Sequence, residues 1–288
     1  MIDPNSIQPP SIEELQILIP QLEILSFIGH GGMGTYYQAR HAKMDRLTAV
    51  KIFRVNPVTD QSIIQKFKLE ARAMAGLNHL HIVKIYDFGE TGSFLFLMME
   101  YVQGDTLERL IDSRGFNLPE IVALITQVCD ALEHAHGQGV IHRDIRPGNT
   151  MLDVNGHVKV GDFGLARLIG EELFRHNLTE TNQAMGTMDY VAPEQFDPEK
   201  TIDYRADIYS VGMMLYKLLT RTLPYGTFTS PSNLVAGLDP RVDDIVICCL
   251  QRNPDNRYQK IQNLRADLIN LLNPQVTSGP RRLNIPKT

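Results

Sequence analysis

The spacing of apolar residues changes once along this chain of 288 residues. From residue 21 to about 102, apolar residues gather in short runs such as LEILSFIG, LTAVKIF and FLFLMMEYV. Short runs of this kind favour β-strands. From about residue 118 apolar residues recur every three or four positions, which is the spacing of an amphipathic helix. The sequence therefore predicts an α+β fold, with a small sheet-rich lobe followed by a larger helical lobe.

Helices are predicted from this periodicity and from the proline and glycine residues that mark their ends. One helix interrupts the first lobe, within DQSIIQKFKLEARAMAGL. The long helix that opens the second lobe has Pro119 in its first turn and Gly137 near its end, the positions that these residues favour. Further helices are predicted near residues 205–220, 241–252 and 260–272. Residues 1–20 form a proline-punctuated extension, and residues 273–288 form a tail rich in Pro, Gly and Arg.

Composition excludes several classes of protein. The net charge is −5 with 21% charged residues, and no basic stripe is present, so we expect no nucleic-acid partner. The longest apolar stretch, VGMMLYKLL, contains Lys217 and is far shorter than the ~20 residues of a membrane span, so no membrane segment is predicted in this chain. The N-terminus lacks the cationic segment of a signal peptide, and we expect a cytoplasmic protein. Cys129, Cys248 and Cys249 lack metal-ligand spacing and are predicted to be reduced core thiols.

A candidate cation site lies in the stretch VIHRDIRPGNTMLDVNGHVKVGDFG. Asn155 and Gly156 predict a two-residue hairpin with a type I′ turn. In that register Asn149 and Asp162 face each other, with Cβ atoms about 5 Å apart. Asp144 is near enough in the sequence to reach the same point, and such oxygen donors suit a hard cation. The alternative is a polar loop end exposed to water.

A buried ion pair is predicted within the first lobe. Glu70 falls on the apolar stripe of the predicted helix, and Lys51 shares a strand face with Ala49 and Phe53. An inward carboxylate and an inward ammonium each need a partner. We therefore expect Lys51 and Glu70 to pair and to hold the lysine for an anionic ligand.

A glycine-rich segment, IGHGGMGTYYQA, contains the spacing G-x-G-x-x-G at Gly29, Gly31 and Gly34. No helix is predicted after it, which disfavours a dinucleotide-binding turn, and it lacks the ending of a Walker A loop. A glycine-tipped hairpin lets backbone N–H groups approach phosphates. Lys51 follows Gly34 by seventeen residues.

Taken in order, these motifs resemble the Hanks-type protein kinases, and the glycine loop is most similar to that of bacterial serine/threonine kinases. The resemblance covers about residues 21–272, with an N-lobe over about 21–101 and a C-lobe over about 103–272. It implies a bilobal protein-kinase fold, with a small antiparallel sheet and one main helix in the N-lobe and a mainly helical C-lobe. It also implies ATP as substrate, Mg²⁺ or Mn²⁺ as cofactor, and transfer of the γ-phosphate to Ser or Thr hydroxyls of proteins.

The resemblance assigns roles to individual residues. Asp144 would accept the proton of the substrate hydroxyl, Lys51 would hold the α- and β-phosphates, and Glu70 would orient Lys51. Asn149 and Asp162 would bind the metal. It further implies nucleotide contacts at Gly29, His30, Gly31, Gly32, Met33, Gly34, Tyr36, Ala49, Lys51, Met99, Glu100, Val102 and Met151. It also implies two structural roles, a brace of the catalytic loop by Asp207 and an ion pair between Glu194 and Arg257.

Two positions depart from the family pattern. Arg146 stands in the catalytic loop where serine/threonine kinases usually carry lysine, and it keeps the positive charge with a different geometry. Tyr36 stands where the family usually has valine above adenine, so it could narrow the pocket or stack on the base. These departures keep open a pseudokinase or nucleotide-binding scaffold as the alternative function, and a small-molecule kinase as a third.

Regulation is predicted in the segment NLTETNQAMGT. The resemblance implies autophosphorylation at Thr179 and Thr181, where a phosphate could pair with Arg143 beside the catalytic aspartate. The alternative is a polar loop that happens to contain threonines. The oligomeric state cannot be read from the sequence.

Overall fold

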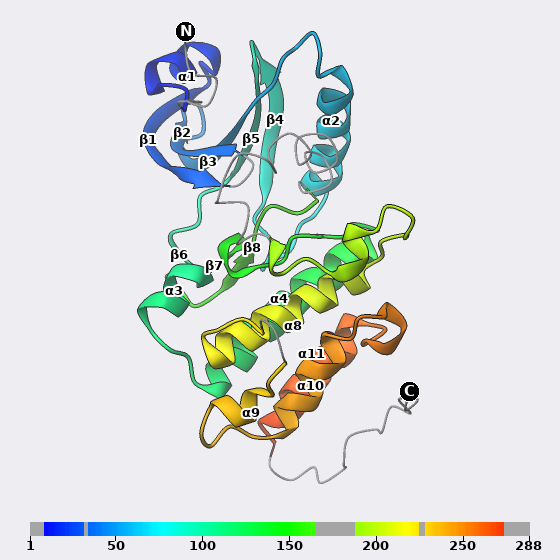
Figure 1. The fold of residues 1–288 in the computed structure, drawn as a ribbon. Helices are drawn as coiled ribbons and strands as arrows, with labels where there is room; N and C mark the ends of the chain where they lie inside the picture. The colour runs from blue at the N-terminus through cyan, green and yellow to red at the C-terminus, as the bar shows by residue number, and fades with distance from the viewer. Residues whose placement is uncertain (1–8, 32–33, 165–187, 225–227, 274–288) are drawn as a thin grey trace, which may run out of the picture.

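The structure is a computed structural model that describes residues 9–31, 34–164, 188–224 and 228–273. It has two lobes, as the change of periodicity predicts (Figure 1). The first lobe contains a five-stranded sheet, and the second is mainly helical. The cleft is the region where Lys51 and Tyr36 of the first lobe contact Asp162, which follows strand β8 (Val158–Val160).

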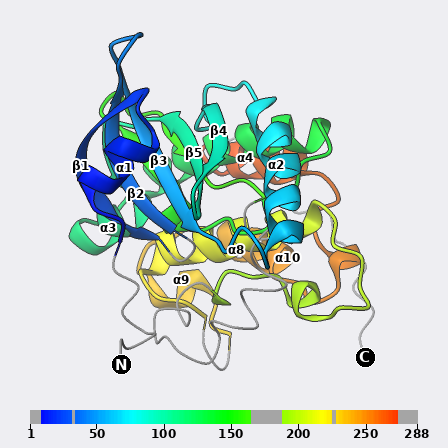
Figure 2. The ribbon, with the colours of Figure 1, turned by 90° about the horizontal axis from the view of Figure 1, so that it is seen from above.

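The sheet of the first lobe is antiparallel throughout, with strand order β1-β2-β3-β5-β4. Its strands are β1 (Leu22–Gly31), β2 (Gly34–His41), β3 (Arg46–Arg54), β4 (Ile85–Thr91) and β5 (Phe94–Glu100). Helix α2 (Gln61–Ala75) lies beside β4 and is the one main helix predicted for this lobe (Figures 1 and 2). Ile63, Phe67 and Met74 of the predicted apolar stripe are buried, together with Ile64 and Ala71, whereas Glu70 is only partly buried.

Helix α1 (Ile12–Leu18) covers another part of the sheet, near β1 (Figure 2). The Ser11 side chain accepts a hydrogen bond from the backbone N–H of Glu14 and so caps the helix. Leu15 and Ile19 enter a second apolar core together with Tyr37 and other residues of the sheet. The extension predicted over residues 1–20 therefore contains a helix that belongs to the core of the first lobe.

The helices of the second lobe pack around α4 (Leu118–Gly137) and α8 (Arg205–Thr220). Asn117 and Glu120 form a capping box at the start of α4. The other helices of this lobe are α3 (Leu107–Ser113), α9 (Pro231–Leu234), α10 (Arg241–Cys249) and α11 (Ile261–Leu271). The four helices predicted from periodicity are confirmed, and the three cysteines are buried and free, as expected. Among the described residues, no helix has the length and apolar character needed to cross a membrane.

A small three-stranded sheet joins the lobes, with β6 (Gly104–Thr106), β7 (Thr150–Asp153) and β8 (Val158–Val160) in the order β6-β7-β8. The predicted type I′ turn between β7 and β8 is wrong. Only Gly156 of the central pair has a positive φ, 84°, and Asp153 bonds to His157 across a three-residue loop. Oδ1 of Asp153 accepts hydrogen bonds from the N–H groups of Asn155 and His157, and this side chain supports the wider loop.

The wider loop shifts the register of the hairpin by one residue. Thr150 lies opposite Val160, and the N–H of Gly161 donates to the carbonyl oxygen of Asn149 at 2.9 Å. Asn149 is therefore opposite Gly161 rather than Asp162, and the predicted face-to-face pair is wrong by one position. A shift of one residue in the register turns a side chain to the other face of a sheet.

Candidate active site

Lys51 is the buried cation of the cleft. Its strand, β3, pairs with β2 so that Lys51 lies directly opposite Tyr36. The side chain is only 2% exposed, and its ammonium lies 4.8 Å from the centroid of the Tyr36 ring. A buried ammonium is unfavourable without a counter-charge, so the identity of its partner matters for the state of the site.

That partner is Asp162, which follows β8. Nζ of Lys51 lies 3.0 Å from Oδ1 of Asp162, and the hydroxyl of Tyr36 donates to Oδ2 at 2.5 Å. Burial acts to raise the pKa of Asp162, but the Lys51 charge and the two hydrogen bonds outweigh burial, so the pKa is lowered. The pKa of Tyr36 is raised well above its ordinary value by burial and by the charge of Asp162. The carboxylate is thus ionised, and the phenol keeps its proton and donates it.

The expected ion pair between Lys51 and Glu70 is not among the ion pairs of the described residues, in which Lys51 pairs with Asp162. Glu70 lies elsewhere along the cleft, since a Cβ built on Gly164 would come 3.4 Å from Oε2 of Glu70. The backbone of Asp162 has a φ of 58°, and its carboxylate faces the ammonium of Lys51. The ammonium of Lys51 pairs with Asp162. The spacing of residues in the sequence cannot show which of the two carboxylates, Asp162 or Glu70, lies closer to it.

Asp144 and Asn149 form a second polar group in the cleft. Nδ2 of Asn149 donates to Oδ2 of Asp144 at 2.8 Å and to its carbonyl oxygen at 2.9 Å. Nε of Arg146 lies 3.6 Å from Oδ2 of Asp144. Burial raises the pKa of Asp144, and the charge of Arg146 and the Asn149 hydrogen bond only partly oppose this. The nearby charge of Asp162 raises the pKa of Asp144 further, so two carboxylates share this part of the cleft.

Asp207 on α8 binds the backbone of the segment that carries Asp144. The carboxylate of Asp207 accepts hydrogen bonds from the backbone N–H groups of His142 (2.9 Å) and Arg143 (2.7 Å). Its Oδ2 also contacts Nε2 of His136 on α4 at 2.8 Å. Burial raises the pKa of Asp207, but these partners outweigh burial and lower it. The predicted bracing role of Asp207 is confirmed, and His136 is a partner that no sequence motif indicated.

A second buried ion pair lies within the second lobe. The guanidinium of Arg257 binds both carboxylate oxygens of Glu194, at 2.6 and 2.7 Å. This pairing was predicted from the sequence and is confirmed. A two-point contact of this kind fixes orientation as well as charge.

The glycine-rich segment forms the hairpin between β1 and β2. His30 and Gly31 of β1 lie opposite Thr35 and Gly34 of β2, so the predicted glycine-tipped hairpin is confirmed. A Cβ on Gly34 would lie 2.7 Å from the carbonyl oxygen of Ile52, and no larger residue fits there. His30 is exposed, and Gly32 and Met33 lie outside the described residues.

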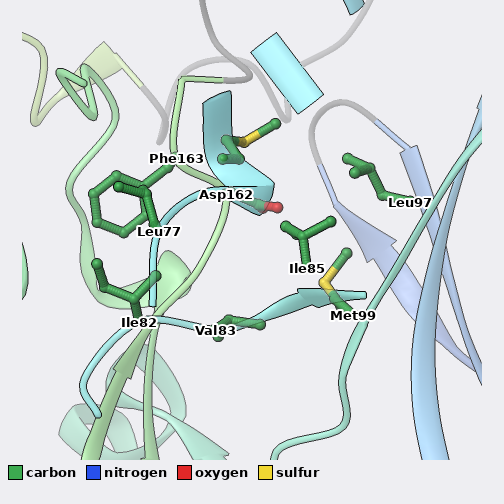
Figure 3. A pocket seen from close by; sticks show the side chains of 9 residues that line it. Leu77, Ile82, Val83, Ile85, Leu97, Met99, Asp162 and Phe163 are labelled. Carbon is green, nitrogen blue, oxygen red and sulfur yellow. The ribbon is translucent and has the colours of Figure 1, made fainter. Parts of the chain in front are cut away.

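The remaining predicted nucleotide contacts lie on β3, β5 and β7 and, for Val102, shortly after β5. Ala49 is paired with Met99 in the ladder between β3 and β5. The side chain of Glu100 is turned to Lys159, with Oε1 2.7 Å from Nζ. Val102 and Met151 are half-buried. Met99 also lines an apolar pocket that reaches Asp162 and Phe163 (Figure 3).

The cleft has the donor chemistry that a magnesium nucleotide requires. Asn149 and Asp162 offer amide and carboxylate oxygens, which are ligands that Mg²⁺ prefers. The carboxylates of Asp144, which is buried, and Asp162, which is partly buried, lie near each other, and such a pair suits a cation. Lys51 adds a cation suited to phosphate. The residues present therefore fit Mg²⁺ and ATP.

The comparisons with known proteins agree with this geometry. The protein kinase domain family matches residues 22–280. The chain belongs to the protein kinase family. Kinase PknB of Mycolicibacterium smegmatis is 36% identical over 287 residues, and PknB of Mycobacterium tuberculosis is 35% identical over 286 residues. These alignments cover 93% and 92% of this chain but 45% of each relative, so the chain spans less than half their length.

Solved protein-kinase structures share the fold. The kinase domain of PknI from Mycobacterium tuberculosis superimposes with a TM-score of 0.71 at 23% identity, covering 87% of this chain and 96% of that domain. The predicted bilobal kinase fold and the similarity to bacterial serine/threonine kinases are both confirmed. Thr179, Thr181 and the rest of the predicted regulatory segment lie outside the described residues of this kinase.

Proposed function

We propose that this chain transfers the γ-phosphate of ATP, with Mg²⁺, to serine and threonine hydroxyl groups of proteins. The observation that carries the proposal is the convergence of Lys51, Asp144 and Asn149, which are buried, with the partly buried Asp162 in a protein-kinase fold. The relatives named serine/threonine-protein kinases support the class of acceptor.

In this proposal Asp144 accepts the proton of the acceptor hydroxyl, and Arg146 beside it offsets developing negative charge. Lys51 binds the α- and β-phosphates once it leaves Asp162, and Glu70 then orients it. Asn149 and Asp162 hold Mg²⁺, which would neutralise charge on the phosphate oxygens. These residues act by position and charge, with no covalent intermediate on the protein.

The nucleotide would lie under the glycine hairpin. Backbone N–H groups of the hairpin from Gly29 to Gly34 would approach the phosphates. The backbone of Glu100 and Val102 would meet adenine, with Met99 as gatekeeper. Ala49, Tyr36 and Met151 would border the base.

The test is transfer of labelled phosphate from ATP to a peptide array, with Asp144→Ala as the matched variant. We expect transfer to Ser or Thr that requires Mg²⁺ and is lost in Asp144→Ala. Nucleotide binding without transfer would favour a pseudokinase or scaffold, and transfer only to a metabolite panel would favour a small-molecule kinase.

We further propose that the kinase phosphorylates itself at Thr179 and Thr181, with Arg143 as a partner for the phosphate. Intact mass after incubation with MgATP should increase by whole phosphates in the wild type and not in Asp144→Ala. An unchanged wild-type mass would contradict the proposal. A cytoplasmic location and the absence of a nucleic-acid partner stay predictions.

A further inference from the structure

The hydrogen bond between Tyr36 and Asp162 crosses the cleft. Tyr36 comes from β2 in the first lobe, and Asp162 follows β8 at the junction with the second lobe. The hydroxyl lies 2.5 Å from Oδ2, and the two residues are 126 positions apart. Since Lys51 takes Oδ1 at 3.0 Å, both oxygens of Asp162 have a protein partner.

The ring of Tyr36 is held by its neighbours. Lys51 lies opposite Tyr36 in one ladder, and its ammonium is 4.8 Å from the ring centroid, within the range of a cation–π contact. Gly29 lies opposite Tyr36 in the other ladder and brings no side chain against it. Tyr36, Lys51 and Asp162 therefore form a connected set in which each member contacts the other two.

This set has a consequence for metal binding. Mg²⁺ binds carboxylate oxygens at about 2.0–2.1 Å and demands a regular arrangement of ligands. A phenol that donates its proton to Oδ2 occupies a lone pair on the oxygen that such a contact would use. The hydrogen bond takes one of the two lone pairs of Oδ2 and withdraws part of its negative charge, so it weakens the bond that this oxygen can form with a metal ion.

We propose that the hydroxyl of Tyr36 competes with the metal ion for Asp162 and so lowers the affinity of the kinase for magnesium nucleotides. The inference rests on the proposed function, in which Asp162 holds Mg²⁺. Tyr36 is then a residue that adjusts nucleotide affinity through Asp162. This role differs from contact of its ring with adenine, because it depends on one oxygen atom and on the metal.

One substitution separates the hydroxyl of Tyr36 from its ring. Tyr36→Phe removes the hydroxyl and keeps the ring over Lys51. Tyr37→Phe is the matched control on the same strand, because the Tyr37 hydroxyl instead donates to the carbonyl oxygen of Pro10 at 2.6 Å within the second core. Thermal unfolding shows whether each variant is folded, and Tyr36→Val is a second variant without the hydroxyl.

The measurement is calorimetric titration of each protein with ADP, once with excess Mg²⁺ and once with EDTA. For Tyr36→Phe we expect affinity for MgADP to rise about tenfold, the size of losing one hydrogen bond to a charged group. Affinity for ADP in EDTA should stay at the wild-type value. Tyr37→Phe should match the wild type in both titrations.

Three results would overturn the inference. An unchanged affinity of Tyr36→Phe for MgADP would show that the hydroxyl does not compete. An equal rise with and without Mg²⁺ would assign the effect to the nucleotide instead of the metal. If neither the wild type nor any variant binds MgADP, the proposed function itself fails. This outcome differs from the other two, because in those the wild type does bind MgADP.

Discussion

The ammonium of Lys51 and the carboxylate of Asp162 form a buried ion pair at 3.0 Å, and this pair connects the sheet of the first lobe to the segment after β8. The pair joins two residues that both have roles in the proposed reaction. In this structure they neutralise each other, whereas the proposed reaction needs Lys51 at the phosphates and Asp162 at the metal. In the proposed function this ion pair therefore opens when nucleotide binds.

Asp162→Asn should destabilise the kinase, because it leaves the Lys51 ammonium buried without a counter-charge. We expect the free energy of unfolding to fall by about 3 kcal/mol in chemical denaturation, the usual cost of breaking a buried pair. Asn suits the positive φ of this position, so the backbone is not the cause. Asp45→Asn is the control, since the pair of Asp45 with Arg40 is exposed and its loss should change little. Equal stability of Asp162→Asn and wild type would contradict the compensation described here.

Asp144→Asn should abolish phosphoryl transfer and raise the melting temperature at pH 7. Burial raises the pKa of Asp144 above its ordinary 3.8, so the folded protein binds this proton more tightly than the unfolded chain. This group's stability contribution is full below the unfolded pKa and is lost as pH rises through the folded pKa. Asparagine carries no charge, so the variant avoids the cost of burying an ionised Asp144 at pH 7. Its gain in melting temperature over the wild type should shrink as pH falls toward 3.8, where Asp144 itself becomes protonated. Thermal unfolding across this pH range tests the sign.

Asp207→Asn is the matched opposite of the preceding substitution. The pKa of Asp207 is lowered despite burial, so its stability contribution is present above 3.8 and is lost as pH falls through the lower folded pKa. At pH 7 this variant should melt below the wild type. If the two asparagine variants shifted the melting temperature in the same direction, the assignment of opposite pKa shifts would be wrong.

Leu15→Ala tests whether α1 belongs to the core of the first lobe. Leu15 is fully buried, and its truncation should cost about 2–5 kcal/mol of the free energy of unfolding. Ile17 on the same helix is 78% exposed, so Ile17→Ala should change stability little. Both variants are compared by urea denaturation, and equal effects would mean that α1 does not pack as described.

Gly212→Ala tests the close contact between α8 and α10. A Cβ at this position would overlap Cβ of Cys249 and would lie 3.1 Å from Cδ2 of Leu250. We expect a loss of about 1–3 kcal/mol, as for other overpacked cores. Gly137→Ala is the control at the end of α4, where a Cβ would meet nothing within 4 Å. A destabilised control, or a neutral Gly212→Ala, would contradict this packing.

Much of the architecture could be predicted from local sequence. The strands of the first lobe and the helices at 118–137 and 205–220 follow from the spacing of apolar residues, because each element buries one face with its own period. The buried position of Lys51 follows from the same spacing. The helix at residues 12–18 could not be predicted in this way, since a seven-residue helix carries little periodic signal.

Which of these groups meet depends on tertiary structure. Sequence spacing paired Lys51 with Glu70, and only the family resemblance brought Asp162 to the same site. Neither could rank the two carboxylates as partners of one ammonium. The side chain of Asp153 set the register of the β7–β8 hairpin, and that register separated Asn149 from Asp162 by one position. The contact of Tyr36 with Asp162 joins residues 126 positions apart. Such pairings depend on distances between elements that are packed by the whole fold, and no local pattern encodes those distances.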